Sequence, residues 1–209
     1  EKNDASNGGW LTNGSGRQFN HAYGFGRIDA NAAVNLSDTW LTKPSEATPL
    51  TNSDTPASGV TIPDNNSTGI DRPLTIAGSS SFFVESVEAV VNITHPYRGD
   101  LKISLTSPNG TTAELTETHN DGNANISNWK LTSVAHWGEN PNGTWTLNIV
   151  DGASSDVGTF NSWNLTINGY LSSTANSTPT SRNVTDSAGS TTFAISNTGS
   201  GTMDWVASV

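Results

Sequence analysis

Residues 134–170 read VAHWGENPNGTWTLNIVDGASSDVGTFNSWNLTINGY, and this stretch decides the fold. It predicts two strands, each preceded by a turn and each begun by a tryptophan, Trp145 and Trp163. In both strands, WTLNIV and WNLTIN, apolar and polar side chains alternate. A period of two is typical of a strand with one buried and one wetted face. The stretch therefore predicts a sheet that is buried on one side.

The composition of the chain favours a β-protein with many turns. The chain has 209 residues, of which 33% are hydrophobic, and small polar residues are plentiful. Its net charge of −10 argues against nucleic acid as a partner, because phosphate neutralisation needs clustered Lys and Arg. No apolar run approaches the roughly 18 residues of a membrane span, so none is predicted. The chain has no cysteine and begins without Met, so we expect a processed piece that holds no disulfide.

The segments upstream of residue 134 predict the remaining strands of the same domain. VEAVVNIT and LKISLTS both alternate, and some seven or eight short strands are expected between residues 60 and 170, the spacing of a sandwich or jelly roll. The predicted fold class is all-β, a jelly-roll-like β-sandwich. Its core is expected to include Trp129, Trp145 and Trp163, with Trp137 near the rim.

The two ends of the chain differ from this pattern. HAYGFGRIDANAAVNL, within residues 1–40, holds the one convincing helix signal, with Asp29 as its cap. Residues 172–182 are rich in Ser and Thr and predict a linker. Residues 183–209 show two strand-like pieces, which we interpret as the incomplete start of a further immunoglobulin-like β-domain.

Two resemblances assign these segments to a family. YGFGRIDANAAV resembles the segment that closes the catalytic domain of subtilisin-type serine proteases, so residues 1–40 would be a remnant of that domain. HPYRGDLKISLTSPNGT, HWGENPNGTWTLNIVD and GTFNSWNLTINGY together resemble the P domain (Homo B domain) of kexin- and furin-type proprotein convertases and their bacterial relatives, over residues 41–171. The resemblance implies a jelly-roll sandwich that follows a subtilisin-like catalytic domain. In that family the P domain supports folding or stability and influences calcium and pH dependence.

No catalytic residue is expected in this chain. The subtilase order of Asp, His and Ser would place all three upstream of Glu1, and no Gly-Thr-Ser nucleophile motif is present. GSGR at residues 14–17 lacks the G-x-S-x-G spacing. His95 and His136 coincide with family motif positions, for which we expect structural roles. No H-E-x-x-H or paired Cys/His spacing predicts zinc.

Calcium is the one cofactor that the sequence makes a candidate. Acidic and amide side chains lie at predicted strand ends and turns, where they could converge as oxygen ligands. The tentative ligands are Asp100, Asp121, Asn123, Asn125, Glu139, Asp151 and Asp156. An EF-hand is rejected, because Ile126 and Thr132 stand where the loop needs Gly and Glu. The alternative is that these side chains cap turns or face water, and Asp100 and Asp151 could accept backbone N–H groups.

Two functions follow from these observations. The leading hypothesis is a non-catalytic P domain of a secreted subtilisin/kexin-like endopeptidase, extracellular or on a bacterial cell surface, whose partner is its own upstream catalytic domain. The second is a module that binds insoluble protein or polysaccharide by aromatic stacking. Its candidates are Trp10, Trp40, Trp137 and Tyr97, which lie outside clear strand alternation. Burial of the same side chains against the protease domain is the competing interpretation.

Overall fold

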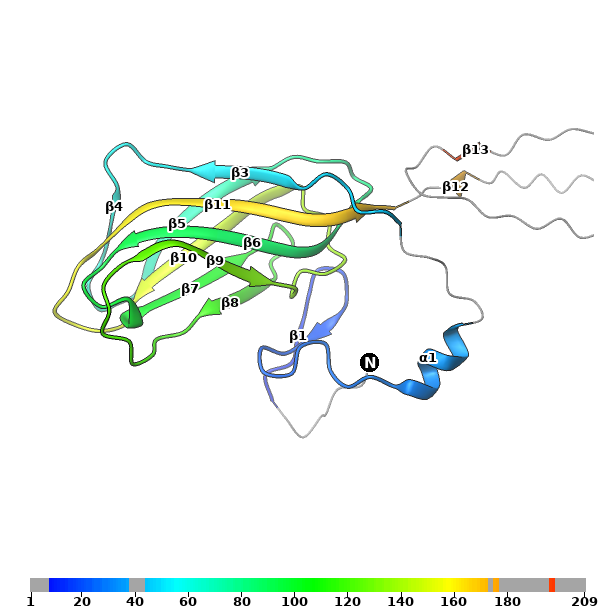
Figure 1. Cartoon of the computed structure of the whole chain (residues 1–209), viewed down its shortest axis with the longest axis horizontal. Helices are drawn as coiled ribbons and strands as arrows, with labels where there is room; N and C mark the ends of the chain where they lie inside the picture. The colour runs from blue at the N-terminus through cyan, green and yellow to red at the C-terminus, as the bar shows by residue number, and fades with distance from the viewer. Residues whose placement is uncertain (1–7, 38–43, 173–174, 177–195, 198–209) are drawn as a thin grey trace, which may run out of the picture.

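The computed structural model describes residues 8–37, 44–172, 175–176 and 196–197. Most of the described chain is a β-sandwich of two antiparallel sheets (Figure 1). One sheet has the strand order β5-β10-β7-β8, and the other has the order β3-β11-β6-β9 with β4 paired to β11. The strands are β3 (Leu50–Asp54), β4 (Val60–Ile62), β5 (Asn66–Ile76), β6 (Phe82–Thr94), β7 (Leu101–Thr106), β8 (Thr112–Thr116), β9 (Ile126–Ser133), β10 (Gly143–Asp151) and β11 (Gly158–Leu171). The predicted all-β sandwich is confirmed.

The alternation in the sequence produces the core between the two sheets. In β10, the side chains of Trp145, Leu147 and Ile149 are fully buried, while the residues between them are only half-buried. Trp163 of β11 is also buried, on the opposite sheet. At about 25 cal/mol per Å2, each large aromatic that is removed from water contributes several kcal/mol before entropy is subtracted.

Trp129 packs against the predicted core but is less buried than Trp145 and Trp163. It lies on β9, the outermost strand of its sheet, and is only half-buried. The guanidinium carbon of Arg98 sits 4.6 Å from the centre of its ring. Trp129 therefore packs against the margin of the core and is covered in part by a cation.

The N-terminal part contains a small hairpin and one helix. Strands β1 (Leu11–Thr12) and β2 (Gln18–Phe19) pair with each other, and α1 spans Ala30–Ser37. The Asp29 carboxylate accepts the Ala32 N–H at 3.0 Å, which confirms the predicted cap. No residue of α1 is buried, and the helix projects away from the sandwich in Figure 1.

The C-terminal predictions lie largely outside the described residues. This holds for most of the linker at 172–182, for the immunoglobulin-like start at 183–209, and for Trp40. Two-residue strands β12 (Ala175–Asn176) and β13 (Ser196–Asn197) pair with each other. Among the described residues, no helix is long and apolar enough to cross a membrane.

Candidate functional site: the strap and its clamp

Residues 9–25, which we call the strap, lie against one side of the sandwich (Figure 1). The N-G-S-G sequence at residues 13–16 closes its hairpin. The side-chain oxygen of Asn13 accepts the N–H groups of Ser15 and Arg17 at 3.1 and 2.9 Å, and Gly16 takes a φ of 81°. Asn and Gly suit such a turn, because Asn bonds to nearby backbone and Gly adopts positive φ without strain.

Asn13 also attaches the strap to the sandwich. Its side chain is 4% exposed, and its amide donates to the carbonyl oxygens of Ala135 and Trp137 at 2.8 and 3.0 Å. The Ser15 hydroxyl donates to the same Trp137 carbonyl at 2.8 Å. These bonds satisfy carbonyls of the loop between β9 and β10, so that loop and the strap hold each other in place.

Glu139 supplies the second attachment. Its carboxylate is 1% exposed and accepts the Gly14 N–H at 2.8 Å, the Thr111 hydroxyl, and the Asn109 amide at 3.3 Å. A Cβ on Gly14 would lie 2.3 Å from the Asn109 Cβ, so this close approach requires glycine. Asn13 and Glu139 together form what we call the clamp. It joins segments that lie more than 90 residues apart in sequence.

An apolar anchor accompanies the clamp. Phe19 is 3% exposed and packs with Ala113 of β8 and Ala135 of the loop after β9, with Phe25 partly buried beside them. Strands β8 and β9 are the outer strands of the two sheets on this side of the sandwich. The strap therefore fills the seam between these two edges, which would otherwise expose apolar surface to water.

The repeated SPNGT and NPNGT turns meet beside the clamp. The Asn109 amide donates to the Asn140 carbonyl at 3.0 Å, and a Cβ on Gly143 would lie 2.8 Å from the Pro108 Cβ. The internal repeat thus builds one paired corner whose residues surround Glu139.

His136 lies buried behind this corner. Its ring packs edge-to-face on Trp145 with centroids 4.9 Å apart, and its Nε2 lies 3.3 Å from the Thr111 carbonyl. Burial lowers the pKa of His136, against the opposing influence of the Glu139 charge and of neighbouring backbone carbonyls. The structural role expected for this histidine agrees with its burial in the core.

At the other end of the strands, His95 and Asp151 form a buried pair. His95 Nε2 lies 3.0 Å from the Asp151 carboxylate, and both side chains are at most 1% exposed. His95 Nδ1 accepts the Tyr97 N–H at 3.1 Å, so Nε2 carries the proton and donates it to Asp151. Asp151 also accepts the Ala153 N–H at 3.2 Å. The predicted backbone bond of Asp151 is therefore present, and the histidine is an additional partner.

Asp121 belongs to a third network. Its carboxylate accepts from Arg98 Nε at 2.7 Å and from the Asn123 N–H at 3.0 Å. The Arg98 bond, followed by those from Asn123, lowers the pKa of Asp121 to about 2. The Asn125 side-chain oxygen accepts the His95 N–H at 3.1 Å. The D-x-N-x-N run thus ties its own loop to the segment before β7.

The seven tentative calcium ligands do not form one cluster, although the Asn123 amide donates to the Asp121 carboxylate at 2.6 Å. Glu139 lies in the clamp, Asp151 pairs with His95, and Asp121 pairs with Arg98. Asp100 and Asp156 are half-buried. Within the described residues, no group of three His, Cys, Asp or Glu side chains could hold a metal ion. Calcium binding stays a prediction, and its strongest acidic candidates already serve as hydrogen-bond acceptors.

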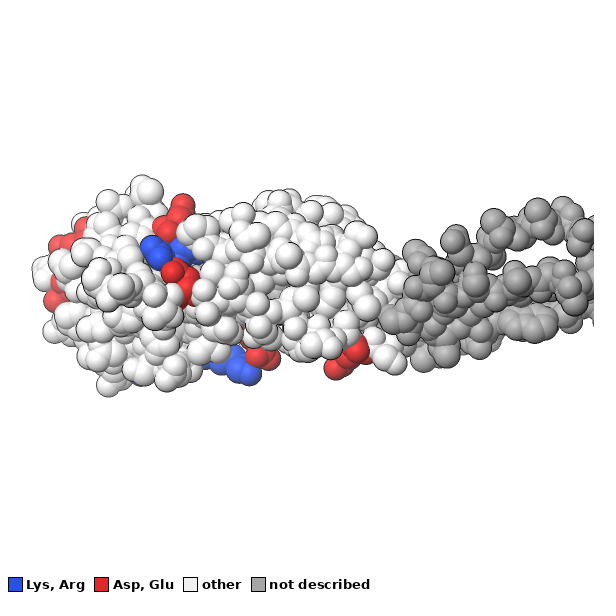
Figure 2. All heavy atoms as spheres, turned by 90° about the horizontal axis from the view of Figure 1, so that it is seen from above, with Lys and Arg blue, Asp and Glu red and all other residues white. Residues whose placement is uncertain are grey.

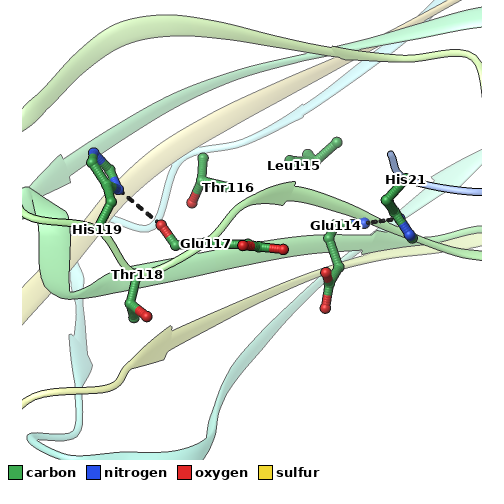
Figure 3. A pocket seen from close by; sticks show the side chains of 7 residues that line it. All are labelled: His21, Glu114, Leu115, Thr116, Glu117, Thr118 and His119. Atoms are coloured by element: carbon green, nitrogen blue, oxygen red, sulfur yellow. Dashed lines mark hydrogen bonds between the residues drawn. The ribbon is translucent and has the colours of Figure 1, made fainter. Parts of the chain in front are cut away.

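An open groove of about 460 Å3 follows the outer edge of β8. Figure 3 shows its lining side chains, which come from β8, from the loop after it and from the strap. His21 Nε2 accepts the Glu114 N–H at 2.9 Å, so the strap also occupies a backbone donor of this edge strand. His119 Nδ1 bonds to the Glu117 carbonyl at 2.8 Å, and Glu114 pairs with Lys102. The side chains of His21, Glu114 and His119 in this groove therefore already have partners.

The candidates for aromatic stacking differ in exposure. Trp10 is half-buried and stacks on Tyr23 with centroids 6.4 Å apart, and Trp137 is half-buried with its ring edge-to-face on Phe25. Tyr97 is 48% exposed. Trp10 thus makes a contact within the strap, and Trp137 makes one between the strap and the sandwich. Neither tryptophan is part of a flat binding platform.

The sequence reasoning missed Asn13, Gly14 and Phe19. The available signal was the N-G-S-G sequence, because Asn and Gly are typical turn residues. Its binding site could not be read from sequence, because the receiving loop lies more than 120 residues away.

Comparison with known proteins finds similarity to proprotein convertases and related endoproteases. The model of the proprotein convertase P-domain family matches residues 84–167. A PC3-like endoprotease of Hydra vulgaris is 38% identical over 156 residues, which are 71% of this chain and 21% of that protein. Human neuroendocrine convertase 2 is 31% identical over 174 residues, or 78% of this chain and 26% of that protein. The chain spans about a fifth of the length of the first curated relatives.

Solved structures agree on the fold. A serine protease of Aeromonas sobria, crystallised in complex with a chaperone, superposes with a TM-score of 0.65. The superposition covers 78% of this chain and 33% of the protease, at 23% sequence identity. A second crystal structure of a serine protease of Aeromonas sobria gives a TM-score of 0.63.

Proposed function

Because residues 84–167 are a P domain of the proprotein convertase family, the non-catalytic part of subtilisin-like proteases, we propose that this chain stabilises the catalytic domain of a secreted endopeptidase. The partner is the chain's own upstream catalytic domain, and residues 26–37 are the surface that meets it. The mechanism is interfacial: apolar area that the two parts bury together adds to the free energy of unfolding of the enzyme.

One observation carries this proposal. Segment 26–37 exposes its large apolar side chains, whereas the strap directly before it buries Phe19 against the sandwich. Ile28 is 83% exposed and Val34 is 69% exposed. Neighbouring apolar side chains on one short segment mark a protein interface, and the strap fixes this segment next to the P domain.

The test compares the same substitutions in two contexts. Ile28→Asn and Val34→Asn in the protease that carries its catalytic domain should each cost about 1.5–3 kcal/mol, because a buried aliphatic side chain is lost from the interface. The measurement is the Tm of the protease and its rate of thermal inactivation. In the 209-residue chain alone the Tm should stay constant, since both side chains face water there. An unchanged Tm of the whole protease would contradict the proposal.

On the face shown in Figure 2, most of the surface carries neither acidic nor basic side chains, and the basic groups lie beside acidic ones. Arg72 pairs with Asp54, and Lys130 pairs with Glu88. No described feature favours the alternative function of binding insoluble substrate, and among its candidates in the described part of the chain Tyr97 is the most exposed, at 48%. A pull-down with insoluble collagen, chitin or cellulose tests that alternative.

A further inference from the structure

The chain contacts the sandwich on both sides of α1. The strap docks into the seam between β8 and β9, the chain then leaves through α1, and it returns to the sandwich at β3 (Figure 1). The segment before α1 is therefore attached to the sandwich by its own contacts as well as by the covalent connection at residues 38–43. These are two separate attachments.

The contacts of the strap have the composition of a small protein interface. Phe19 is the buried anchor, and the ring of Phe25 meets Trp137 edge-to-face with centroids 6.4 Å apart. Polar bonds from the neighbouring turn accompany the anchor: two from the Asn13 amide, one from the Ser15 hydroxyl and one from the Gly14 N–H to Glu139. A buried aromatic anchor that is accompanied by satisfied hydrogen bonds is typical of a binding hot spot.

The strap also holds its own shape. Asn13 organises the first turn through its side-chain oxygen, and Asn20 organises the second by accepting the Ala22 N–H at 2.8 Å. The backbone groups of Asn20 and Gly24 bond to each other in both directions at 2.8 Å. A segment that is ordered before it binds loses less conformational entropy on binding, which strengthens its affinity.

We propose that the strap and the seam form a self-sufficient interface, which holds the sandwich to the enzyme when the chain is cut between α1 and β3. The proposal rests on the proposed function, because it concerns how the P domain stays on its protease. In this arrangement, a proteolytic nick in the connection would convert one chain into a stable two-chain complex.

The experiment uses the whole 209-residue chain with a site-specific protease sequence inserted between residues 37 and 44. After cutting, size exclusion and native mass spectrometry measure how much of the N-terminal fragment stays with the sandwich. We expect most of it to co-elute at about 10 µM protein, which requires a Kd of about 1 µM or below. Near-UV circular dichroism of the same sample should match that of the uncut chain.

Two variants identify the contacts responsible. Asn13→Ala removes both bonds to the loop before β10, and each such bond is worth about fivefold in an equilibrium constant, so the Kd should rise about 30-fold or more. Val34→Asn is the matched control on the same fragment. It lies outside the strap on an exposed face of α1, and its retention should equal that of the parent.

Each measurement of fragment retention either supports or overturns the proposal of a self-sufficient interface. Separation of the fragments of the parent chain after cutting, or unfolding of the sandwich, would overturn the proposal. Equal retention of the parent and of Asn13→Ala would show that the clamp does not hold the strap, and would overturn it as well. None of these outcomes depends on catalytic-domain stability, which is measured in the uncut protease, so the two proposals can fail separately.

Discussion

Replacement of Asp151 by alanine tests the most deeply buried polar pair of the sandwich. The carboxylate accepts hydrogen bonds from His95 Nε2, with an N···O distance of 3.0 Å, and from the Ala153 backbone nitrogen, at 3.2 Å. Hydrogen bonds to a charged acceptor contribute about 1.5–3 kcal/mol each, and a buried donor left without a partner costs about 1–3 kcal/mol. Removing the carboxylate also removes the cost of burying a charge, which offsets part of this loss. We therefore expect a net loss of about 3–4 kcal/mol in the free energy of unfolding.

The assay is urea denaturation of the whole chain, followed by the fluorescence of its buried tryptophans. Asp156→Ala is the control, because this side chain is half-buried and should cost less than about 0.5 kcal/mol. Both variants are measured with calcium and with chelator. The Asp151→Ala loss should be equal in the two conditions, because the carboxylate accepts from His95 and from the Ala153 N–H, and neither bond requires a metal.

Two results would refute this reasoning. A loss below about 1 kcal/mol would mean that the pair contributes little more than an exposed contact. A loss that appears only with calcium would mean that Asp151 is a metal ligand, and it would support the calcium site predicted from sequence. A double-mutant cycle with His95→Phe separates the pair from the rest, because a direct bond requires a coupling energy of at least about 1 kcal/mol.

Three further predictions concern the clamp and two of the groups with a shifted pKa, His136 and Asp121. Gly14→Ala should lower the free energy of unfolding by about 1–3 kcal/mol, because the new Cβ would overlap the Asn109 Cβ; thermal denaturation measures this. His136 has a lowered pKa in the folded chain, so the unfolded chain binds the proton more readily and stability should fall as pH drops below about 6.5; His136→Gln should flatten that part of the pH–stability curve. Asp121 has a pKa of about 2, so its contribution is present above pH 4 and lost as pH falls toward 2; Arg98→Met should raise this pKa toward its ordinary value of 3.8 in an NMR titration of the carboxyl carbon.

The strands could be predicted because burial acts on every second residue. Val87, Ala89 and Val91 of β6 are all fully buried, as their spacing indicates, and eight strands from β4 to β11 occupy the expected region. The alternation of apolar and polar residues shows which face of a strand is buried. It does not show which strand lies at the edge of a sheet, and for this reason it does not predict that Trp129, on the outer strand β9, contacts the core but is only half-buried.

The carboxylates were harder to interpret than the strands. Sequence places Asp121, Glu139 and Asp151 correctly at turns and strand ends, but oxygen ligands for a metal and acceptors for buried donors have the same local pattern. The choice depends on which donors face them in space. His95 lies 56 residues from Asp151, and Gly14 lies 125 residues from Glu139, so local pattern holds no information about either partner.

The position of the strap gives the acidic clamp residue a physical reason to be buried. A carboxylate inside a protein is costly unless several donors satisfy it. Glu139 meets that condition through Gly14, Thr111 and Asn109, and only Gly14 comes from outside the sandwich. When the strap is in place the carboxylate is satisfied, and when the strap leaves, one donor is lost and water must replace it. The hydrogen bonds of the buried Glu139 carboxylate are thus complete only when the strap that leads to α1 is docked. The stability of the P domain therefore depends on the segment through which it would contact an enzyme.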